Sequence, residues 1–238
     1  MSESIVEKYR PANLDEVVGQ TLVVKKIKNM IAKNLFSNLL FIGPPGTGKT
    51  SVAQCIAKEF WRLNWKESAS GQFSSEPTGS WSQLFHWFHG RDLTVTMINT
   101  TIKQLTEYVG RRIIFIDEAD GLDKTDQQAL RPLMEGSRNA TFILSCNNED
   151  AIHPAVKSRC TVLKFKPIKP EDVFKRLFEI CKKEHYIQAG DPPIVNQFLT
   201  RLSRQTGGDL RGAINDLEPY ISEGKIDLEL IKEYLEGR

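Results

Sequence analysis

The sequence predicts an α/β fold, in which a parallel sheet with a phosphate-binding loop is flanked by helices and followed by a small all-α domain. A glycine-rich loop at residues 43–50 stands between an apolar run and a helix-forming segment, the order expected of a phosphate-binding fold. Two more apolar runs, 113–116 and 141–145, lead into polar residues, which is typical of strands buried in a parallel sheet. After residue 168 the apolar spacing is helical.

The glycine-rich loop follows the pattern G-x-x-x-x-G-K-S/T and consists of Gly43, Pro44, Pro45, Gly46, Thr47, Gly48, Lys49 and Thr50. Its glycines allow the backbone to turn its N–H groups toward an anion, and the helix that follows adds its positive dipole end. Lys49 can reach β- and γ-phosphates, and the Thr50 hydroxyl can ligate Mg²⁺. The loop therefore predicts a site for a nucleoside triphosphate with Mg²⁺.

Acidic and amide side chains follow the other two apolar runs. Asp117 and Glu118 come directly after residues 113–116, and Asn147 lies just beyond residues 141–145. Open α/β sheets bind ligands at the carboxyl ends of their strands, so we expect these side chains to meet beside the glycine-rich loop. There Asp117 would hold Mg²⁺ through its water shell and Glu118 would polarise an attacking water. Asn147 would hydrogen-bond that water or the γ-phosphate.

The remaining elements are predicted from apolar spacing and turn residues. In the first part of the chain they are helices at 21–34, 51–60, 102–109 and 124–135, and strands at 93–98 and 162–165. Pro132 is expected to kink or shorten the helix that contains it. Further helices are predicted at 171–185, 193–205, 209–222 and 228–235. The predicted division is an α/β domain at 1–168 and a helical domain at 169–238.

A turn-rich segment between residues 65 and 91 interrupts these patterns and ends in a group of aromatic side chains. We expect this group, from Trp81 to Phe88, to pack its own loop against the domain, and a partner-binding patch is the alternative. His86 and His89 have no third metal ligand nearby in the sequence, so no metal site is predicted there.

Composition excludes several classes of protein. The chain has 238 residues, 40% hydrophobic and 26% charged, and its net charge of +2 neither demands nor excludes a nucleic-acid partner. Its apolar runs are too short to span a bilayer and its polar start lacks a secretory signal, so no membrane association is expected. Scattered cysteines predict reduced thiols in a cytoplasmic protein rather than disulfides or zinc: Cys55, Cys146, Cys160 and Cys181.

Short motifs occur along the chain in the order Glu7–Pro11, 43–50, Asp117–Asp120, Gln127–Arg131, Ser145–Asn147, Ser158–Cys160 and Gly208–Arg211. With these motifs the chain resembles the clamp-loader ATPases of the AAA+ superfamily, and among them the replication factor C small subunits of archaea and eukaryotes. The resemblance covers nearly the whole chain except about 66–92. It implies a P-loop AAA+ fold whose C-terminal helices form a lid over bound ATP.

The resemblance implies roles that spacing does not show. Asn147 would be sensor 1, Arg211 would reach the γ-phosphate from the lid as sensor 2, and Arg159 would be an arginine finger for the ATP of a neighbouring subunit. With Glu118 and Lys49 these residues form the expected catalytic set. The expected nucleotide-binding set is Tyr9, Arg10, Val17 and Val18 around the adenine, then Gly43, Pro44, Pro45, Gly46, Thr47, Gly48, Lys49, Thr50, Ser51, Asp117, Asn147 and Arg211, with Thr50 and Asp117 at Mg²⁺.

The resemblance also implies partners. Members of the family form open rings of five subunits, which bind a sliding clamp on one face and primer–template DNA inside. ATP binding opens the clamp and hydrolysis releases it onto DNA, so the implied partners are the clamp, the DNA and other loader subunits. The implied location is cytoplasmic in archaea or nuclear in eukaryotes. A nucleotide-binding structural subunit and another AAA+ DNA-remodelling ATPase are the alternatives.

The sequence departs from the family pattern in several places. The aromatic segment at about 66–91 has no counterpart, the family's stretch Asn-Ala-Ser-Asp-Glu-Arg-Gly is missing, and Pro132 and Gly212 replace arginines. These 238 residues also hold no counterpart of the C-terminal collar that joins the family's rings, so we expect the chain alone to be mainly monomeric. Basic residues near the expected DNA-facing helices form either a solvated face or a phosphate track: Lys103, Arg111, Arg112, Lys124 and Arg131.

Overall fold

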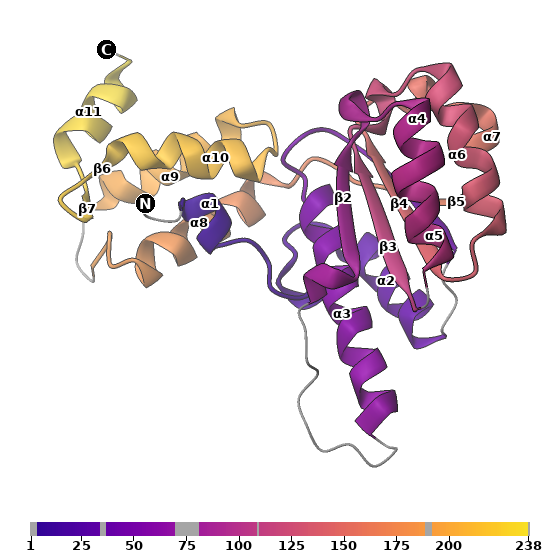
Figure 1. The fold of residues 1–238 in the computed structure, drawn as a ribbon. Helices are drawn as coiled ribbons and strands as arrows, with labels where there is room; N and C mark the ends of the chain where they lie inside the picture. Colours follow the sequence, from indigo (N-terminus) through magenta and orange to yellow (C-terminus); the bar gives the residue numbers. More distant parts are fainter. Residues whose placement is uncertain (1–3, 34–36, 70–80, 109, 189–191, 238) are drawn as a thin grey trace.

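The computed structural model describes residues 4–33, 37–69, 81–108, 110–188 and 192–237. Within these ranges the chain forms an α/β part and a smaller helical part, which lie side by side (Figure 1). The predicted fold class is confirmed: a parallel sheet between helices comes first, and a mostly helical part follows.

Five parallel strands form the sheet of the α/β part. In sequence they are β1 (Asn38–Ile42), β2 (Phe85–His89), β3 (Arg112–Asp117), β4 (Ala140–Cys146) and β5 (Cys160–Lys164). Their order in the sheet is β2-β3-β4-β1-β5. The central strands β1, β3 and β4 are apolar on both faces, as strands of a covered parallel sheet are. Because all strands run in one direction, the loops that leave β1, β3 and β4 meet at one edge.

Helices cover both faces of this sheet (Figure 1). On one face lie α2 (Thr21–Ala32) and α3 (Lys49–Ala69), and on the other lie α6 (Lys124–Gly136) and α7 (Pro154–Lys157). Successive residues of β1 point to opposite faces, so Phe41 packs with α2 and α3 whereas Leu40 packs with α6 and α7. The helix α6 continues through Pro132, so of the expected kink or shortening the shortening is wrong.

The strand expected at 93–98 is wrong, because that segment is helical. It contains α4 (Val95–Met97) and the start of a π-helical turn (Ile98–Ile102), after which comes α5 (Lys103–Glu107). The Thr94 hydroxyl caps α4 by accepting the Met97 N–H at 3.4 Å. Ile98 and Ile102 are fully buried in the core that α6 shares. Burial of these side chains outweighs the strand preference of their β-branched type.

The edge strand β2 lies inside the aromatic segment instead. Its Phe85 stacks on Phe115 of β3 with ring centroids 5.7 Å apart, and Trp81 packs into the same core. Phe88 packs against the core on the other face, while Trp87 is 42% exposed. The aromatic side chains therefore fasten an additional strand to the sheet. Residues 70–80, where the sequence is richest in turn residues, lie outside the described residues.

The helical part consists, within the described residues, of α8 (Pro170–Lys183), α9 (Pro193–Gln205), α10 (Leu210–Leu217) and α11 (Leu228–Glu236), with a short hairpin of β6 (Ile221–Ser222) and β7 (Lys225–Ile226). Its core is separate from that of the sheet and is centred on residues such as Leu177 and Phe198. The helix expected at 209–222 ends at Leu217, because a 3₁₀ turn (Glu218–Tyr220) leads into the hairpin.

The first helix, α1 (Ile5–Lys8), packs on the helical part rather than on the sheet (Figure 1). The Ile5 N–H donates to Oε1 of Glu218 at 3.3 Å, and the ring of Tyr9 packs against the core of the helical part. The division at residue 168 stays a proposal, to which we add that α1 belongs with the helical part.

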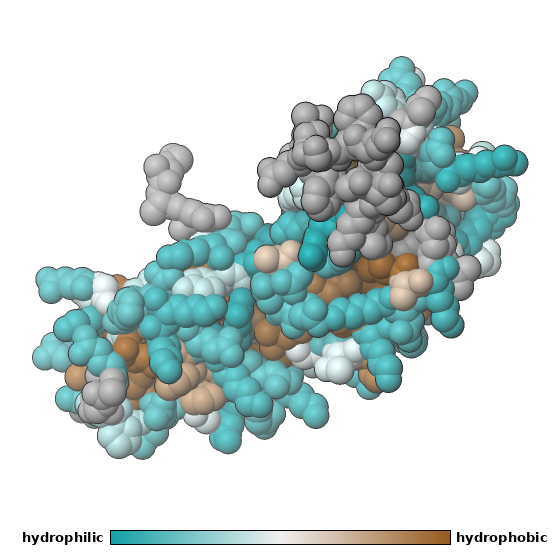
Figure 2. All heavy atoms as spheres, turned by 90° about the horizontal axis from the view of Figure 1, so that it is seen from below, coloured by the Kyte–Doolittle hydropathy of each residue, from teal (hydrophilic) through white to brown (hydrophobic). Residues whose placement is uncertain are grey.

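Hydrophilic side chains predominate on the face shown in Figure 2, where apolar residues appear in smaller areas. The large apolar side chains that are exposed are spread over several elements, and only Leu228 and Leu230 share one helix, α11: Leu22, Trp87, Tyr108, Phe178, Leu228 and Leu230. In the part of the chain that the structure describes, no helix combines the length and the apolar character needed to cross a membrane.

Candidate nucleotide-binding site

The glycine-rich loop joins the end of β1 to the start of α3 and borders an open space. Gly46 and Gly48 have φ angles of +67° and +96°, left-handed conformations that a side chain disfavours. Thr47 stabilises the turn, because its hydroxyl donates to the Pro44 carbonyl at 2.8 Å. A Cβ placed on Gly48 would meet no atom of the described residues within 4 Å. The backbone here therefore borders a space that a ligand can fill.

Lys49, the first residue of α3, is a buried cation at this space. Its ammonium donates to the carbonyls of Gly43 (2.6 Å) and Pro44 (2.9 Å) and to Oδ1 of Asn147 (2.9 Å). Its exposed fraction is only 9%, and burial lowers its pKa below the usual lysine value. All three acceptors are neutral, so the cost of burying the charge favours an anionic ligand beside it. A triphosphate fits this environment.

Thr50 and Asp117 face each other next to Lys49. The Thr50 hydroxyl donates to Oδ2 of Asp117 at 3.0 Å, and the Ser145 hydroxyl donates to the other carboxylate oxygen. The sheet brings these residues together, since Asp117 ends β3 and Ser145 lies in the neighbouring strand β4. A hydroxyl beside a carboxylate at the phosphate loop is the kind of pair that holds Mg²⁺ through few protein ligands. The residues therefore fit the predicted metal site.

Glu118 leaves β3 in a left-handed conformation, with φ of +52° and ψ of +46°, which non-glycine residues seldom adopt. Its N–H donates to the Ser145 hydroxyl at 3.2 Å and so helps to hold this turn. Its side chain is half exposed and lines the same cavity as Lys49 and Thr50. The turn thus places a carboxylate in the cavity where a reacting water would have to stand.

Arg91 is a further site residue, which the sequence did not single out. Its Nε lies 3.7 Å from Oε2 of Glu118. Arg91 belongs to the 3₁₀ turn Gly90–Asp92 after β2. Because the sequence predicted the strand at 93–98 instead, Arg91 was not expected at a strand end. Gly90 permits the approach, because a Cβ there would lie 2.3 Å from the Glu118 carbonyl oxygen. The change from the aromatic run 85–89 to Gly-Arg-Asp was the available signal of a strand end.

A second cavity adjoins the loop on the side of the helical part. Its described lining is Val6, Tyr9, Arg10, Pro11, Val17, Val18, Gly46, Thr47, Gly48, Ser51, Ile168, Leu210, Arg211 and Ile214. The residues expected around the adenine are therefore brought together, and Arg10 donates to the Ser51 hydroxyl at 3.3 Å. Apolar walls with few polar groups suit a planar base. Sequence reasoning missed the apolar residues that α10 adds, because a helix shows no local sign of the pocket that it faces.

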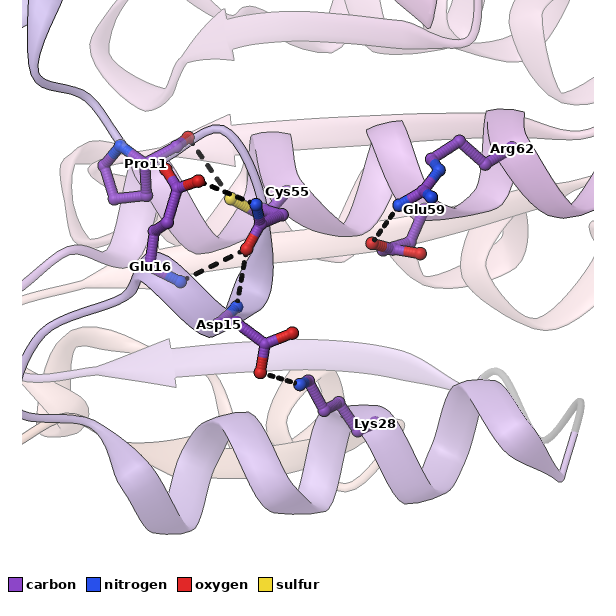
Figure 3. Close-up of polar contacts among 8 residues, drawn as sticks. Pro11, Asp15, Glu16, Lys28, Cys55, Glu59 and Arg62 are labelled. Atoms are coloured by element: carbon purple, nitrogen blue, oxygen red, sulfur yellow. Dashed lines mark hydrogen bonds and ion pairs between the residues drawn. The ribbon is translucent and has the colours of Figure 1, made fainter.

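The segment that leads to this cavity is fastened to two helices (Figure 3). The Cys55 thiol of α3 donates to the Pro11 carbonyl at 3.5 Å. Lys28 of α2 forms an ion pair with Asp15. These contacts hold Pro11 and the turn Leu14–Glu16, which directly precedes Val17 in the cavity wall.

The helical part touches the glycine-rich loop through the start of α10. The Leu210 N–H donates to the Gly46 carbonyl at 3.3 Å. A Cβ on Gly46 would lie 1.6 Å from Oδ1 of Asp209, the residue that caps α10, so this close approach requires glycine. Arg211, in the first turn of α10, lines both cavities. The expected sensor of the lid therefore lies beside the phosphate loop.

Arg159 lies outside this cluster, whereas the other four expected catalytic residues line one cavity. It directly precedes β5, at the amino-terminal edge of the sheet, opposite the glycine-rich loop. Its guanidinium forms an ion pair with Glu135 and donates to the Ala155 carbonyl. It also lines a polar cavity with Arg111 and Arg138, at the amino ends of β3 and β4. Within one chain Arg159 is therefore separated from Lys49 by the sheet.

The chain matches one family model and several known proteins. Residues 39–168 match the family described as "ATPase family associated with various cellular activities (AAA)". The replication factor C small subunit of Archaeoglobus fulgidus is 38% identical over 227 residues, which cover 93% of this chain and 65% of that protein. The Thermoplasma volcanium protein of the same name is 33% identical over 241 residues, which cover 99% of this chain and 69% of that protein. The chain thus spans about two thirds of the length of these relatives.

Solved structures show the same fold at lower identity. The RuvB Holliday junction branch migration motor of Thermotoga maritima superposes with a TM-score of 0.70 at 18% identity, over 96% of this chain and 72% of that one. A point mutant of the same motor gives a TM-score of 0.71, also at 18% identity, over 97% of this chain and 73% of that one. The structural likenesses show the fold, and the sequence matches show that the chain belongs to the AAA ATPase family and, within it, to the replication factor C small subunits.

Proposed function

We propose that this chain is the ATP-binding and ATP-hydrolysing part of a DNA sliding-clamp loader. In this proposal ATP binding leads to opening of the clamp, and hydrolysis leads to its release on primer–template DNA. The observation that carries it is the meeting of Lys49, Asp117 and Asn147 in one cavity, in a relative of replication factor C small subunits. The chain would act where DNA is replicated, in the cytoplasm of an archaeon or the nucleus of a eukaryote.

Each side chain in the cavity would have a task in hydrolysis. Lys49 would exchange its carbonyl partners for β- and γ-phosphate oxygens. Thr50 and Asp117 would hold Mg²⁺, which when bound neutralises charge on those oxygens. Glu118 would orient a water and take up its proton. Asn147 would hydrogen-bond the water or the γ-phosphate, with Lys49 fixing the direction of its amide.

Arg211 would make the position of the helical part depend on the nucleotide. The helix α10 touches Gly46 and carries Arg211 into both cavities. A guanidinium binds phosphate oxygens in charge-assisted pairs, so ATP would offer Arg211 a partner that ADP lacks. We propose that this difference in lid position is what neighbouring subunits and the clamp respond to.

Arg159 would serve the ATP of a neighbouring subunit. The sheet separates it from Lys49 of its own chain, and the described lining of its cavity holds three arginines, of which Arg159 is paired with Glu135. Guanidinium groups gathered in this way suit phosphate oxygens that are presented from outside the chain. In related phosphoryl transfers an arginine supplied by a partner is worth about 10³–10⁵ in rate.

A mixture of two inactive variants tests this role. Lys49→Ala loses its own site but offers an intact Arg159, and Arg159→Ala has the opposite defect. In an assembly with clamp and primer–template DNA, each variant alone should be inactive, and the mixture should regain hydrolysis at the interfaces that pair the two. Arg159→Ala should bind ATP with wild-type affinity. A mixture that stays inactive beside an active wild type, or loss of ATP binding in Arg159→Ala, overturns the role in trans.

The same assay separates the proposal from its alternatives. The proposal expects ATP hydrolysis that clamp and primer–template DNA stimulate together. A structural subunit would bind ATP without turnover in any assembly. Another DNA-remodelling ATPase would respond to DNA and ignore the clamp. Either of these results contradicts clamp loading.

Two of the basic residues expected near DNA make contacts within the chain. Nζ of Lys103 lies 3.9 Å from Oε1 of Glu107, and the Arg112 guanidinium lies 4.3 Å from the centre of the Tyr108 ring. These internal contacts favour the solvated-face interpretation for both basic residues. We keep primer–template DNA as a proposed partner because the resemblance to the replication factor C small subunits implies it.

A further inference from the structure

Asp120 links two loops of the nucleotide-binding site. It lies in the 3₁₀ turn Ala119–Gly121 after β3, and its Oδ2 accepts the backbone N–H groups of Asn147 and Asn148, each at 3.1 Å. These two residues are the first beyond β4. One carboxylate oxygen therefore holds the start of the loop that leaves the neighbouring strand.

The loop held by Asp120 carries a side chain of the site. Oδ1 of Asn147 accepts a hydrogen bond from Nζ of Lys49 at 2.9 Å. Contacts thus run from the Asp120 carboxylate to the main chain of Asn147, and from the Asn147 amide to Lys49. Hydrogen bonds to a charged acceptor are roughly twice as strong as neutral ones. Two of them on consecutive N–H groups restrict both the position and the rotation of the loop.

The turn that carries Asp120 is fixed on its other side. It begins at Glu118 with the left-handed conformation already described, and the Gly121 N–H donates to the Glu118 carbonyl at 2.8 Å. A Cβ on Gly121 would lie 2.7 Å from Cγ of Arg91, so the turn packs tightly against the end of β2. Because the turn is held in this way, the Asp120 carboxylate is a fixed support for the loop after β4.

We propose that Asp120 is a positioning residue for ATP hydrolysis, which sets where the Asn147 amide stands relative to the γ-phosphate. The proposal rests on the ATPase function above. Asp120 is absent from the described residues that line the cavity, so it acts through Asn147 rather than on the nucleotide. Without its carboxylate both N–H groups would depend on water, and small displacements of a catalytic group are costly in rate.

A set of four variants tests this role: Asp120→Ala, Asp120→Asn, Asn147→Ala and the double alanine variant. Asp120→Ala should lower kcat about tenfold with KM within about twofold, as expected when a transition-state contact loses its support. Asp120→Asn keeps an oxygen acceptor and should restore most of kcat. In the Asn147→Ala background, Asp120→Ala should cost little more, because the side chain through which it acts is gone.

Asp227 supplies a matched control. Its Oδ1 accepts the N–H groups of Glu229 (2.9 Å) and Leu230 (3.2 Å) at the start of α11, far along the chain from the site. Asp227→Ala removes the same kind of contact and should lower thermal stability with kcat unchanged. An equal loss of kcat in Asp227→Ala, or additive losses in the double alanine variant, overturns the positioning role.

The ratio of ATP to ADP affinity, measured with fluorescent nucleotides, separates failure of the positioning role from failure of the proposed function. The ratio should fall by the same small factor, within about twofold, in Asp120→Ala and Asn147→Ala. If wild type hydrolyses ATP through Lys49 while Asp120→Ala keeps both kcat and the ratio, the positioning role alone is wrong. If wild type does not bind ATP, the proposed function is wrong and the inference falls with it. Should Asp120→Ala not fold, Asp120→Ser, which offers one shorter acceptor, replaces it in every comparison.

Discussion

Nε of Arg91 and Oε2 of Glu118 lie 3.7 Å apart, so an arginine at the end of the edge strand faces the acid that would activate water. The side chains are 77% and 50% exposed, which leaves the pair sensitive to salt and to any partner that draws the arginine away. The contacts of the Glu118 carboxylate therefore depend on Arg91, in the turn after β2.

Arg91→Ala is expected to raise the basal rate of ATP hydrolysis by up to about fivefold. An exposed pair contributes at most about 1 kcal/mol, and its loss frees the Glu118 carboxylate for water. Arg91→Lys keeps a cation and should behave like wild type. Hydrolysis measured at low and high salt tests whether the ion pair with Glu118 is the cause. The salt response of the wild-type rate should disappear in Arg91→Ala. A variant that keeps the wild-type rate and salt response contradicts it.

Glu118→Gln should bind ATP with unchanged affinity and lose about 10²–10⁴-fold in kcat, because the amide keeps the shape but cannot accept a proton. Rapid-quench hydrolysis and nucleotide titration measure the two quantities separately. Glu223→Gln is the matched control, since Glu223 is also a left-handed glutamate, with φ of +51°, in an exposed turn of the helical part. Normal turnover in Glu118→Gln would mean that another group is the base.

The affinity for ATP should fall as pH rises through the lowered pKa of Lys49, before ordinary lysines lose their protons. The triphosphate pairs with the ammonium form, which disappears first in a buried lysine. In the nucleotide-free protein the unfolded state binds more protons between the two pKa values, so the contribution of Lys49 to stability rises with pH over that window. Calorimetric titration with ATP across this pH range measures the effect.

Three variants control the Lys49 prediction. Lys49→Arg keeps its charge at every accessible pH and should lose the pH dependence, whatever affinity its different geometry gives at neutral pH. Lys49→Ala should abolish ATP binding, and Lys26→Ala, which removes an exposed lysine of α2, should change nothing. An unchanged affinity in Lys49→Ala would refute the assignment of the phosphate loop.

Gly46→Ala should weaken ATP binding at least about tenfold and lower the thermal midpoint by several degrees. Alanine would have to adopt a φ of +67°, and its Cβ would collide with the Asp209 carboxylate. Gly136→Ala is the control, because that glycine ends α6 and a Cβ there meets no described atom within 4 Å. Gly136→Ala should leave the ATP affinity unchanged and should leave the thermal midpoint unchanged or raise it slightly. Wild-type affinity in Gly46→Ala would show that α10 can withdraw from the loop without cost.

The part of the site that follows strand ends could be predicted from the sequence. The apolar runs mark β1, β3 and β4, and in a parallel sheet their carboxyl ends meet at one edge. The hydrogen bonds of Thr50 with Asp117 and of Lys49 with Asn147 agree with that expectation. Local order along the chain was sufficient here, because each side chain stands directly beside a strand that hydrophobicity identifies.

Contacts set by tertiary packing could not be predicted in this way. Apolar and polar residues alternate over 93–98 as they do in a strand. The segment is nevertheless helical, and Ile98 is buried in the core. The true edge strand is aromatic and follows a turn-rich stretch, so its pattern resembled a loop. Because the strand was predicted at 93–98 rather than at 85–89, Arg91 was not recognised as a residue at a strand end. The hydrogen bonds of Asp120 could not be predicted, because their donors lie in the loop after another strand.

The packing of α1 on the helical part means that the chain passes between the two parts twice. One passage follows Tyr9, the other includes Ile168, and both border the second cavity. A body attached at two points turns freely only about the line that joins them. The helical part would therefore have one easy rotation, and twisting about other axes would strain one passage or the other. Cleavage of the backbone just after Pro11 would leave both cores intact and remove this restriction, so that the proposed response of the helical part to ATP would be lost.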